Sequence, residues 1–227
     1  MNSSIDFSET RVLIIDDEEF MRIMVRRLLK NIGVTNVSEA ADGADGLTKL
    51  TSDPPDLIIL DIMMEPMNGL KFLKMLRTGM SGAPRDLPVV VITGSAEQAV
   101  FGTAMKLDCN AFVRKGDGQD AIQGRMARVL DETTEIKEAG AYLTVNIPDI
   151  TITAPTGSRP PPSAPPATKA YEVPIEDVEP GAVVARDVVT ENGDVLLEEG
   201  TVISASYLGR LQDISEIIDL PYIWVEM

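Results

Sequence analysis

Short apolar runs alternate with segments of helical period over the first 139 residues of the chain. This alternation is typical of repeated β-α units and predicts an α/β domain with a parallel sheet. The purest apolar run, residues 56–61, is expected to be a central strand covered on both faces. Strands are expected near 11–15, 35–40, 56–61, 88–92 and 110–114, and helices near 18–31, 43–51, 68–79, 96–107 and 118–138.

The pattern changes after residue 139. Residues 142–147 alternate well enough to predict a short strand. Residues 151–170 are then rich in Pro, Ser, Thr and Ala, a composition that excludes a regular helix or a central strand and favours an extended spacer. We therefore divide the chain into a first domain at 9–139, a Pro-rich linker at 140–170 and a second domain at 171–227.

The closing segment has the pattern of a small β-rich domain. Asn192-Gly193 stands between two apolar runs, at 182–189 and 195–197, and Asn-Gly is the strongest short signal for a β-hairpin. Ser204 is expected to cap a helix that runs to about residue 214, and residues 222–225 are expected to be a final strand.

The net charge of the chain bears on whether it binds DNA or membranes. The chain has 36 acidic and 20 basic residues, a formal net charge of -16, which disfavours binding to DNA or to an anionic membrane surface. No apolar stretch approaches the roughly 20 residues of a membrane helix, and the first residues lack the basic and apolar segments of a signal peptide. We expect a soluble cytoplasmic protein with no DNA or membrane partner.

The chain contains no histidine and one cysteine, Cys109. The absence of an imidazole excludes Ser-His-Asp and Cys-His catalytic sites, a histidine phosphodonor and the metal-binding His-Asp pair of HD-type phosphohydrolases. A single cysteine excludes an internal disulfide and a multi-cysteine zinc site.

Polar side chains follow four of the predicted strands. Asp16-Asp17, Asp61, Thr93 and Lys115 stand at the ends of the first, third, fourth and fifth strands, and these ends meet at one edge of a parallel sheet. Clustered carboxylates stay ionised most readily around a hard divalent cation such as Mg²⁺. Phosphoryl transfer to a carboxylate needs the charge on the moving group to be neutralised, which an ion and the Lys115 ammonium can provide.

These residues resemble the motifs of receiver domains of two-component response regulators. The resemblance covers about residues 9–139 and includes Met64, Met67 and Gly69 after the acidic strand end. It implies a doubly wound, flavodoxin-like sheet of five parallel strands in the order 2-1-3-4-5, followed here by a second small β-rich domain. It also implies a phosphoryl acceptor, not an enzyme, with at most slow self-dephosphorylation.

The resemblance assigns a role to each matching residue. Asp61 would accept a phosphoryl group from a sensor histidine kinase or a phosphotransfer protein. Asp17, Asp61 and the main-chain carbonyl of Met63 would bind Mg²⁺ directly, and Asp16 would act through water. Thr93 would contact the phosphoryl group and form a switch pair with Phe112, and Lys115 would also contact the phosphoryl group.

Two positions depart from the family pattern. Glu65 separates Met64 from Pro66, where the family commonly has Met-Pro, so the loop after Asp61 is expected to differ in shape. Gly116 follows Lys115 in place of the usual proline, which loosens the loop that holds the lysine.

The closing domain resembles small β modules that accompany HD-type phosphohydrolase domains, although the HD domain itself is excluded. This favours a response regulator that signals by contact with a downstream protein. A phosphate sink or relay receiver, whose second domain is structural or forms a phosphorylation-dependent homodimer, is the alternative.

Two other functions are disfavoured by single residue types. A haloacid dehalogenase-type phosphohydrolase is disfavoured because Met63 stands where that class needs an aspartate. A cyclic dinucleotide ligand is disfavoured because the module has only two arginines.

The first helix carries a basic stripe at Arg22, Arg26 and Lys30, spaced so that the three residues share a face. Two interpretations remain open, a solvated surface or a docking surface for an acidic partner.

Overall fold

A computed structural model describes residues 6–94, 100–148, 170–190, 195–218 and 220–226. The chain divides into two compact units. The N-terminal unit consists of Met1–Gly94 and Leu107–Ile147, and the C-terminal unit of Ser95–Lys106 and Pro148–Met227. Nearly all of the predicted Pro-rich spacer lies outside the described residues, and the domain boundaries at 9–139, 140–170 and 171–227 stay predictions.

The N-terminal unit is built on the predicted five-stranded parallel sheet. The strand order is β2-β1-β3-β4-β5, which confirms the doubly wound, flavodoxin-like arrangement. The strands are β1 (Arg11–Ile15), β2 (Asn36–Ala40), β3 (Leu57–Asp61), β4 (Val89–Thr93) and β5 (Ala111–Arg114). Every residue of β3 and β4 is buried, as expected for central strands.

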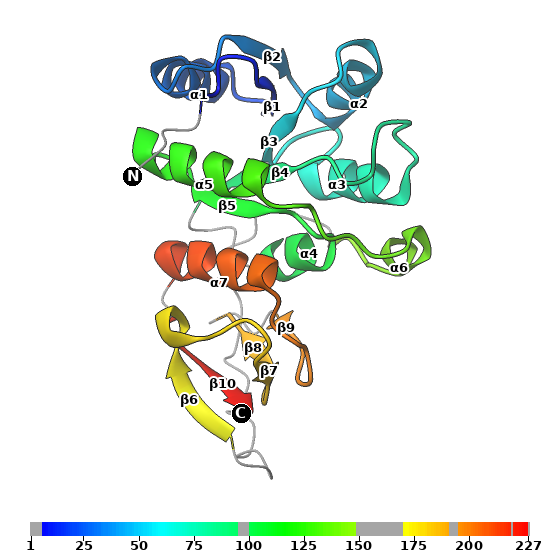
Figure 1. Cartoon of the computed structure of the whole chain (residues 1–227). Helices are drawn as coiled ribbons and strands as arrows, with labels where there is room; N and C mark the ends of the chain where they lie inside the picture. Colours follow the sequence, from blue (N-terminus) through cyan, green and yellow to red (C-terminus); the bar gives the residue numbers. More distant parts are fainter. Residues whose placement is uncertain (1–5, 95–99, 149–169, 191–194, 219, 227) are drawn as a thin grey trace. The chain divides into compact units, whose positions relative to one another are not determined.

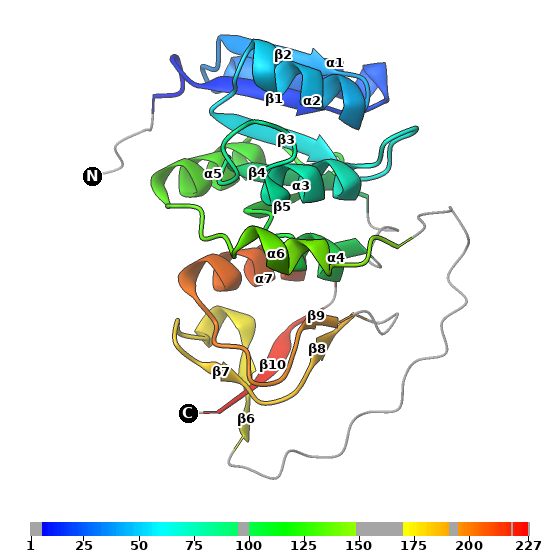
Figure 2. The ribbon, with the colours of Figure 1, turned by 90° about the vertical axis from the view of Figure 1, so that its right-hand side faces the viewer.

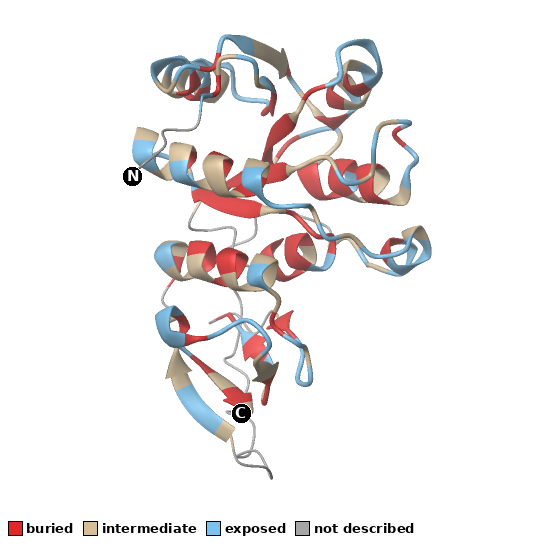
Figure 3. Ribbon diagram, in the orientation of Figure 1, coloured by how far each residue is buried: buried red, intermediate tan, exposed pale blue. Residues whose placement is uncertain are grey.

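Helices cover both faces of this sheet (Figure 1). Helices α1 (Glu19–Asn31) and α5 (Gln119–Asp131) lie on one face, and α2 (Gly43–Ser52) and α3 (Gly69–Thr78) on the other. Side chains at alternate strand positions join α1 and α5 in one apolar core, so the intervening positions face the opposite layer. The buried strands and inner helix faces of this unit are visible in Figure 3.

The segment after α5 departs from the sequence prediction. Helix was expected over 118–138, but α5 ends at Asp131 and Glu132 is extended. Thr133 and Thr134 are poor helix formers, and the Asn110 side chain donates to the hydroxyl of Thr134 at 2.9 Å, which fixes that segment outside the helix.

The predicted strand at 142–147 is wrong. Its first residues belong to a short helix, α6 (Ala139–Leu143), and the rest pairs with no strand. The Lys74 ammonium donates to the carbonyls of Leu143 and Val145 at 3.0 and 2.7 Å, so a side chain from α3 satisfies groups that a sheet partner would otherwise bind.

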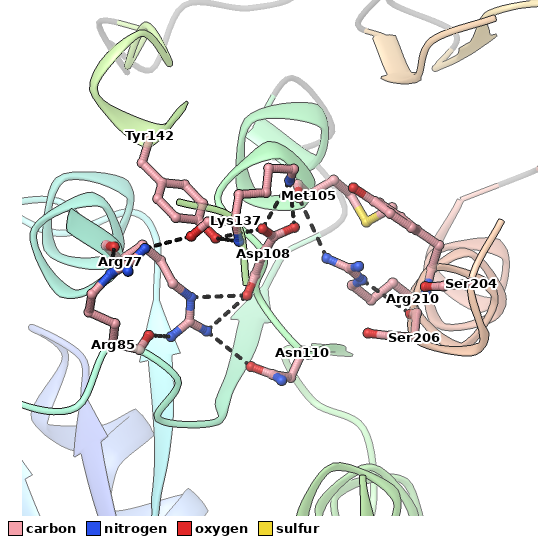
Figure 4. A network of polar contacts seen from close by, with 11 residues as sticks. Arg77, Arg85, Met105, Asp108, Asn110, Lys137, Tyr142, Ser204, Ser206 and Arg210 are labelled. Carbon is pink, nitrogen blue, oxygen red and sulfur yellow. Dashed lines mark hydrogen bonds and ion pairs between the residues drawn. The ribbon is translucent and has the colours of Figure 1, made fainter. Parts of the chain in front are cut away.

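A buried polar network at Asp108 fastens this segment to the rest of the N-terminal unit (Figure 4). The Asp108 carboxylate accepts from the Lys137 ammonium at 2.8 Å and from the Tyr142 hydroxyl at 2.7 Å. Its carbonyl accepts from the guanidinium of Arg77, a fully buried residue of α3. Burial raises the pKa of Tyr142, and the hydrogen bond to Asp108 raises it further.

The C-terminal unit holds two small antiparallel sheets, which are drawn from a second side in Figure 2. One has the order β6-β10-β7 and the other pairs β8 with β9. The elements are α4 (Phe101–Lys106), β6 (Ala170–Pro174), η2 (Ile175–Asp177), β7 (Val183–Val184), β8 (Val188–Val189), β9 (Val195–Leu197), α7 (Ala205–Ile217) and β10 (Tyr222–Glu226). We call residues 170–226 the C-terminal module.

Most of the sequence predictions for the C-terminal module hold. The β8–β9 pair is the predicted hairpin, although its turn at 191–194 lies outside the described residues. Ser204 caps α7 by accepting from the main-chain nitrogen of Tyr207 at 3.2 Å, and the helix runs three residues further than expected.

The run at 182–189 was expected to be one strand and is instead divided into β7 and β8. Between them, Ala185 donates to the carbonyl of Trp224, and the carboxylate of Asp187 accepts from Glu199 N at 2.7 Å. The run is thus divided because its first part pairs with β10 and its last part pairs with β9. No described helix has both the length and the apolar character needed to span a bilayer.

Candidate functional site

Four strands of the N-terminal unit end at the same edge of the sheet. Asp61 is the last residue of β3 and Thr93 the last of β4, while Asp16 directly follows β1 and Lys115 directly follows β5. All four strands are parallel, so the sheet itself brings these side chains to one edge.

Three carboxylates form a cluster at this edge. One carboxylate oxygen each from Asp16, Asp17 and Asp61 lies within 4.8 Å of the other two. Asp61 is 1% exposed and Asp16 is 4% exposed, whereas Asp17 is exposed to solvent. The cluster therefore combines two buried acids with one that solvent reaches.

Lys115 places a positive charge beside the buried acids. Its ammonium lies 3.0 Å from Oδ2 of Asp61, 3.7 Å from Oδ2 of Asp16 and 3.7 Å from Oε1 of Glu18. The Lys115 main-chain nitrogen donates to the carbonyl of Thr93 at 2.8 Å, which ties the start of the lysine loop to the end of β4. Gly116, the next residue, has φ +97°, a conformation that L side chains rarely adopt.

Burial raises the pKa of Asp16, although Lys115 and a hydrogen bond from the main chain of Glu18 oppose that rise. The hydrogen bond runs from the Glu18 nitrogen to Oδ1 of Asp16 at 2.8 Å. The charged form of this carboxylate is therefore costly in the absence of a further cation.

Arg22 from α1 shapes the turn that carries the acidic pair. Its guanidinium donates to the carbonyls of Asp16 and Asp17 at 2.8 and 3.3 Å and also bonds Glu39 of β2. Arg26, the next residue of the basic stripe, bonds the same Glu39 at 2.6 Å. Arg22 and Arg26 of the stripe therefore form hydrogen bonds within the N-terminal unit. The sequence did not predict these bonds, because helical spacing does not reveal contacts with a loop or a neighbouring strand.

The loop after Asp61 depends on a close approach by Gly69. A Cβ added to Gly69 would lie 2.1 Å from the carbonyl oxygen of Asp61 and 2.9 Å from Cα of Ile62. Gly69 N also donates to the Ile62 carbonyl at 3.0 Å, and Met63 N donates to Oδ1 of Asp61 at 3.2 Å. Only glycine leaves room for the start of α3 against this loop.

Thr93 and Phe112 share one face of the sheet. Their strand neighbours Ile92 and Val113 lie in the core between the sheet and α1 and α5, so Thr93 and Phe112 face the other layer. Phe112 is paired in register with Val91, two residues before Thr93. Both residues are fully buried, and the Thr93 hydroxyl donates to the Gly94 carbonyl at 3.2 Å.

The donor set fits a hard divalent cation. Carboxylate oxygens from two buried acids and one exposed acid converge, and such ligands suit Mg²⁺, which keeps several of its waters. The residues predicted from sequence to form the site, Asp16, Asp17, Asp61 and Lys115, are brought together, while their chemical roles stay predictions.

The part of the chain that contains this site is similar to known proteins. The model of the family described as the response regulator receiver domain matches residues 12–127. Protein CcdB of Bacillus subtilis is 31% identical over 121 residues, which are 53% of this chain and 98% of that protein. The matched region contains every predicted site residue.

A second relative is longer than the part it shares with this chain. Response regulator MprA of Mycolicibacterium vanbaalenii is 31% identical over 144 residues, which are 63% of this chain and 59% of that protein. A solved structure of a Chloroflexus aurantiacus protein assigned as a response regulator has a TM-score of 0.50 and 22% identity, covering 54% of this chain and 98% of its own. At that identity the likeness concerns the fold alone.

Proposed function

The chain belongs to the response regulator receiver domain family of two-component systems, and we propose that within it Asp61 is the residue that accepts the phosphoryl group. The observation that carries this proposal is the position of Asp61. Its carboxylate is buried at a strand end, 3.0 Å from the Lys115 ammonium and within the acidic cluster.

The proposed reaction moves one group. A carboxylate oxygen of Asp61 forms a bond to phosphorus while the bond between phosphorus and the donor atom breaks, and that electron pair leaves with the donor. The chain has no histidine, so the donor is another molecule, and we propose a sensor histidine kinase or a phosphotransfer protein. Lys115 is close enough to Asp61 to neutralise an oxygen of the arriving group.

We propose Asp17, Asp61 and the main-chain carbonyl of Met63 as direct Mg²⁺ ligands, with Asp16 acting through water. When bound, the ion supplies positive charge to the oxygens of the transferred group. The residues themselves contribute a fixed geometry, because Arg22 holds the carbonyls of Asp16 and Asp17 and the Met63 nitrogen holds Oδ1 of Asp61. The raised pKa of Asp16 also favours a site completed by a cation.

Thr93 and Phe112 are proposed to change conformation when Asp61 is phosphorylated and so to alter the surrounding structure. The Thr93 hydroxyl donates to the adjacent main chain in the bond described above, and we propose that a bond to a phosphoryl oxygen replaces it. Phe112 is buried on the same face, two register positions away, and we propose that a shift at Thr93 is accompanied by repacking of the aromatic ring.

The output is proposed to be contact with a downstream protein through the C-terminal module, with no binding to DNA or to a membrane. The support is electrostatic, because a net charge of -16 repels phosphate backbones. The resemblance of the module to those accompanying HD-type phosphohydrolases stays a hypothesis, since the family match ends at residue 127. Cytoplasmic location and, at most, slow self-dephosphorylation belong to the same proposal.

A phosphate sink or relay receiver is the alternative, with the module acting as a structural or dimerising element. Two measurements separate it from an output regulator. The full chain is incubated with acetyl phosphate, with Mg²⁺ or with a chelator, and labelling is expected only with Mg²⁺. Partner capture and oligomeric state are then compared with and without the phosphoryl mimic beryllofluoride. Labelling that leaves partners and oligomeric state unchanged would favour the sink.

A further inference from the structure

Strand β6 is at the edge of the three-stranded sheet of the C-terminal module. The strand order is β6-β10-β7, and among the described strands β6 pairs with β10 alone. Tyr171 and Glu172 are exposed, and the middle of β6 is pale blue in Figure 3. An exposed edge strand offers main-chain groups to which another extended chain can bind.

The register of β6 against β10 shows which main-chain groups of β6 face the free edge. Ile175 N donates to the Pro221 carbonyl at 3.1 Å, in continuation of the register that pairs Val173 with Ile223. In an antiparallel pair, residues that bond the partner strand alternate with residues whose N–H and C=O groups point away from it. Val173 therefore bonds β10, and Glu172 directs its main-chain groups outward.

The other side of β10 agrees with this assignment. Trp224 is paired in register with Glu172, and its carbonyl accepts from Ala185 N at 2.8 Å, on the side of β10 that faces β7. Trp224 thus turns its main-chain groups away from β6, and Glu172 does the same on the opposite side. Pro174, the next outward position of β6, has no N–H, so Glu172 supplies the donor of this edge at its centre.

A groove of about 510 Å³ adjoins this edge, where β6 ends and η2 begins. Its apolar walls include Ile175, Leu220 and Tyr222, and the Tyr222 side chain is 53% exposed. Two exposed acids, Glu176 of η2 and Glu216 of α7, also line it. We call this the glutamate groove. Apolar walls with two carboxylates suit a long side chain that has an apolar stem and a positive end.

The charge of the C-terminal module also favours a basic partner. Its basic residues are Arg186 and Arg210. Arg210 is 2% exposed and its Nε donates to the Ser206 carbonyl, while the Arg186 guanidinium lies 4.8 Å from the centre of the Trp224 ring. Both cations therefore make contacts within the module. A surface of this sign attracts a positively charged segment and orients it during association.

A second copy of the chain fits the edge less well than a basic segment does. Two β6 strands paired antiparallel around Glu172 would place two carboxylates opposite each other, which is destabilising. The net charge of -16 adds repulsion between whole chains. A basic segment meets neither cost.

We propose that the β6 edge and the glutamate groove form a docking site for an extended, basic segment of a partner protein. The segment adds a strand beside β6 through hydrogen bonds to the main chain of Glu172, and it places a Lys or Arg side chain in the glutamate groove. At roughly 3.3 Å per residue, about five or six residues reach from Glu172 to Glu176. This inference rests on the proposed function in one respect, because it gives the chemistry of the downstream protein.

A peptide of about six residues that alternates Val and Lys, capped at both ends, is the probe for this site. It is added to the full-length, unphosphorylated chain, and a Val-Glu peptide of the same length is the control. Trp224 is the only tryptophan of the chain and lies opposite Glu172, so its fluorescence reports binding. The Val-Lys peptide is expected to change this fluorescence saturably and to slow hydrogen exchange at the Glu172 amide, measured by NMR. The Val-Glu peptide is expected to do neither.

Variants separate strand addition from charge attraction. Glu176→Lys and Glu216→Lys are each expected to weaken peptide binding at least about fivefold, the upper end for an exposed ion pair. Glu199→Lys is the matched control, because Glu199 is exposed and makes the same change of charge away from the groove. Glu172→Pro is expected to bind at least about threefold more weakly than Glu172→Gln, since both lose the carboxylate but only proline loses the N–H. That N–H faces away from β10, so proline is compatible with the sheet.

Three results would overturn the inference. They are no saturable binding of the Val-Lys peptide, equal binding by the Glu176, Glu216 and Glu199 variants, and binding that leaves exchange at the Glu172 amide unchanged. Self-association that Glu172→Pro abolishes would identify a second copy as the occupant and would also overturn it. Should Glu172→Pro not fold, exchange at Glu172 and the two groove variants decide. Every measurement is made without phosphorylation, so failure here leaves the assignment of Asp61 intact, and failure to label Asp61 would leave peptide binding unaffected.

Discussion

The Lys115 ammonium lies 3.0 Å from Oδ2 of Asp61, while the nearest oxygen of Asp16 is 3.7 Å away. The lysine therefore sits against the proposed acceptor and not at the centre of the acidic cluster. This position gives it a role toward an arriving phosphoryl group that differs from the role of the carboxylates that would hold a metal ion.

Lys115→Ala is expected to leave Mg²⁺ affinity unchanged or higher, because it removes a cation that competes for the carboxylates. The same variant is expected to be labelled by acetyl phosphate more slowly than the wild type, because the Lys115 ammonium lies 3.0 Å from Oδ2 of Asp61 and would neutralise the arriving group. Asp17→Ala is the comparison and should lose Mg²⁺ affinity by at least about tenfold, the lower end of what even outer-shell partners contribute. Isothermal titration calorimetry measures the Mg²⁺ affinity of both variants. An equal loss of Mg²⁺ affinity in the two variants would refute these roles.

Arg22→Ala is expected to weaken Mg²⁺ binding several-fold, because Arg22 holds the carbonyls of Asp16 and Asp17 in the turn. Arg26→Ala is a matched control from the same stripe, since Arg26 also bonds Glu39, whereas the described donor to the carbonyls of that turn is Arg22. Calorimetric titration of both variants checks the distinction. Equal affinities would mean that Arg22 has no positioning role.

Gly69→Ala is expected to destabilise the protein by about 1–3 kcal/mol and to slow phosphoryl labelling, because the new methyl group would overlap the Asp61 carbonyl. Gly140→Ala is the control, since Gly140 also lies near a helix start and an added Cβ there meets nothing within 4 Å. Urea denaturation followed by far-UV circular dichroism measures the stability. A Gly69 variant as stable and as active as the control would contradict the close approach.

Much of the site was predictable because it depends on strand ends. Each of Asp16, Asp61, Thr93 and Lys115 closes an apolar run, and a parallel sheet brings such ends together without further information. The strand order followed from the family resemblance, not from the pattern alone.

The elements that were mispredicted depend on contacts between distant residues. Helix α5 ends earlier than predicted, and the Asn110 side chain donates a hydrogen bond to Thr134 beyond its end. Lys74 of α3 donates to carbonyls in 142–147 that would have paired with a neighbouring strand. Local periodicity contains no signal for partners tens of residues away. The same limit hid the close approach of Gly102 in α4 to the Val195 carbonyl of β9, because the two residues are far apart in the sequence.

Tyr142→Phe is expected to cost about 2 kcal/mol, because it removes the hydrogen bond to the Asp108 carboxylate. The pKa of Tyr142 is raised in the folded chain, so the neutral phenol is favoured and its stabilisation is complete below the unfolded pKa of about 10. As pH rises above about 10 this stabilisation is lost, and the stability gap between wild type and variant narrows.

Urea midpoints of the two proteins at about pH 8 and at about pH 10.5 measure that gap, on either side of the phenol's reference pKa. Tyr171→Phe is the control, because Tyr171 is half-exposed and its substitution should change neither midpoint by more than a small amount. A gap that stays constant across the two pH values would show that the Tyr142 hydroxyl does not act as described.

The central claim is that Asp61 accepts the phosphoryl group. Wild-type chain and Asp61→Asn are incubated with acetyl phosphate and Mg²⁺, and intact-protein mass spectrometry counts the phosphoryl groups added to each. One group per wild-type chain and none on Asp61→Asn is the predicted result, because an amide cannot accept the group. Stoichiometric labelling of Asp61→Asn would contradict the assignment and place the acceptor elsewhere in the chain.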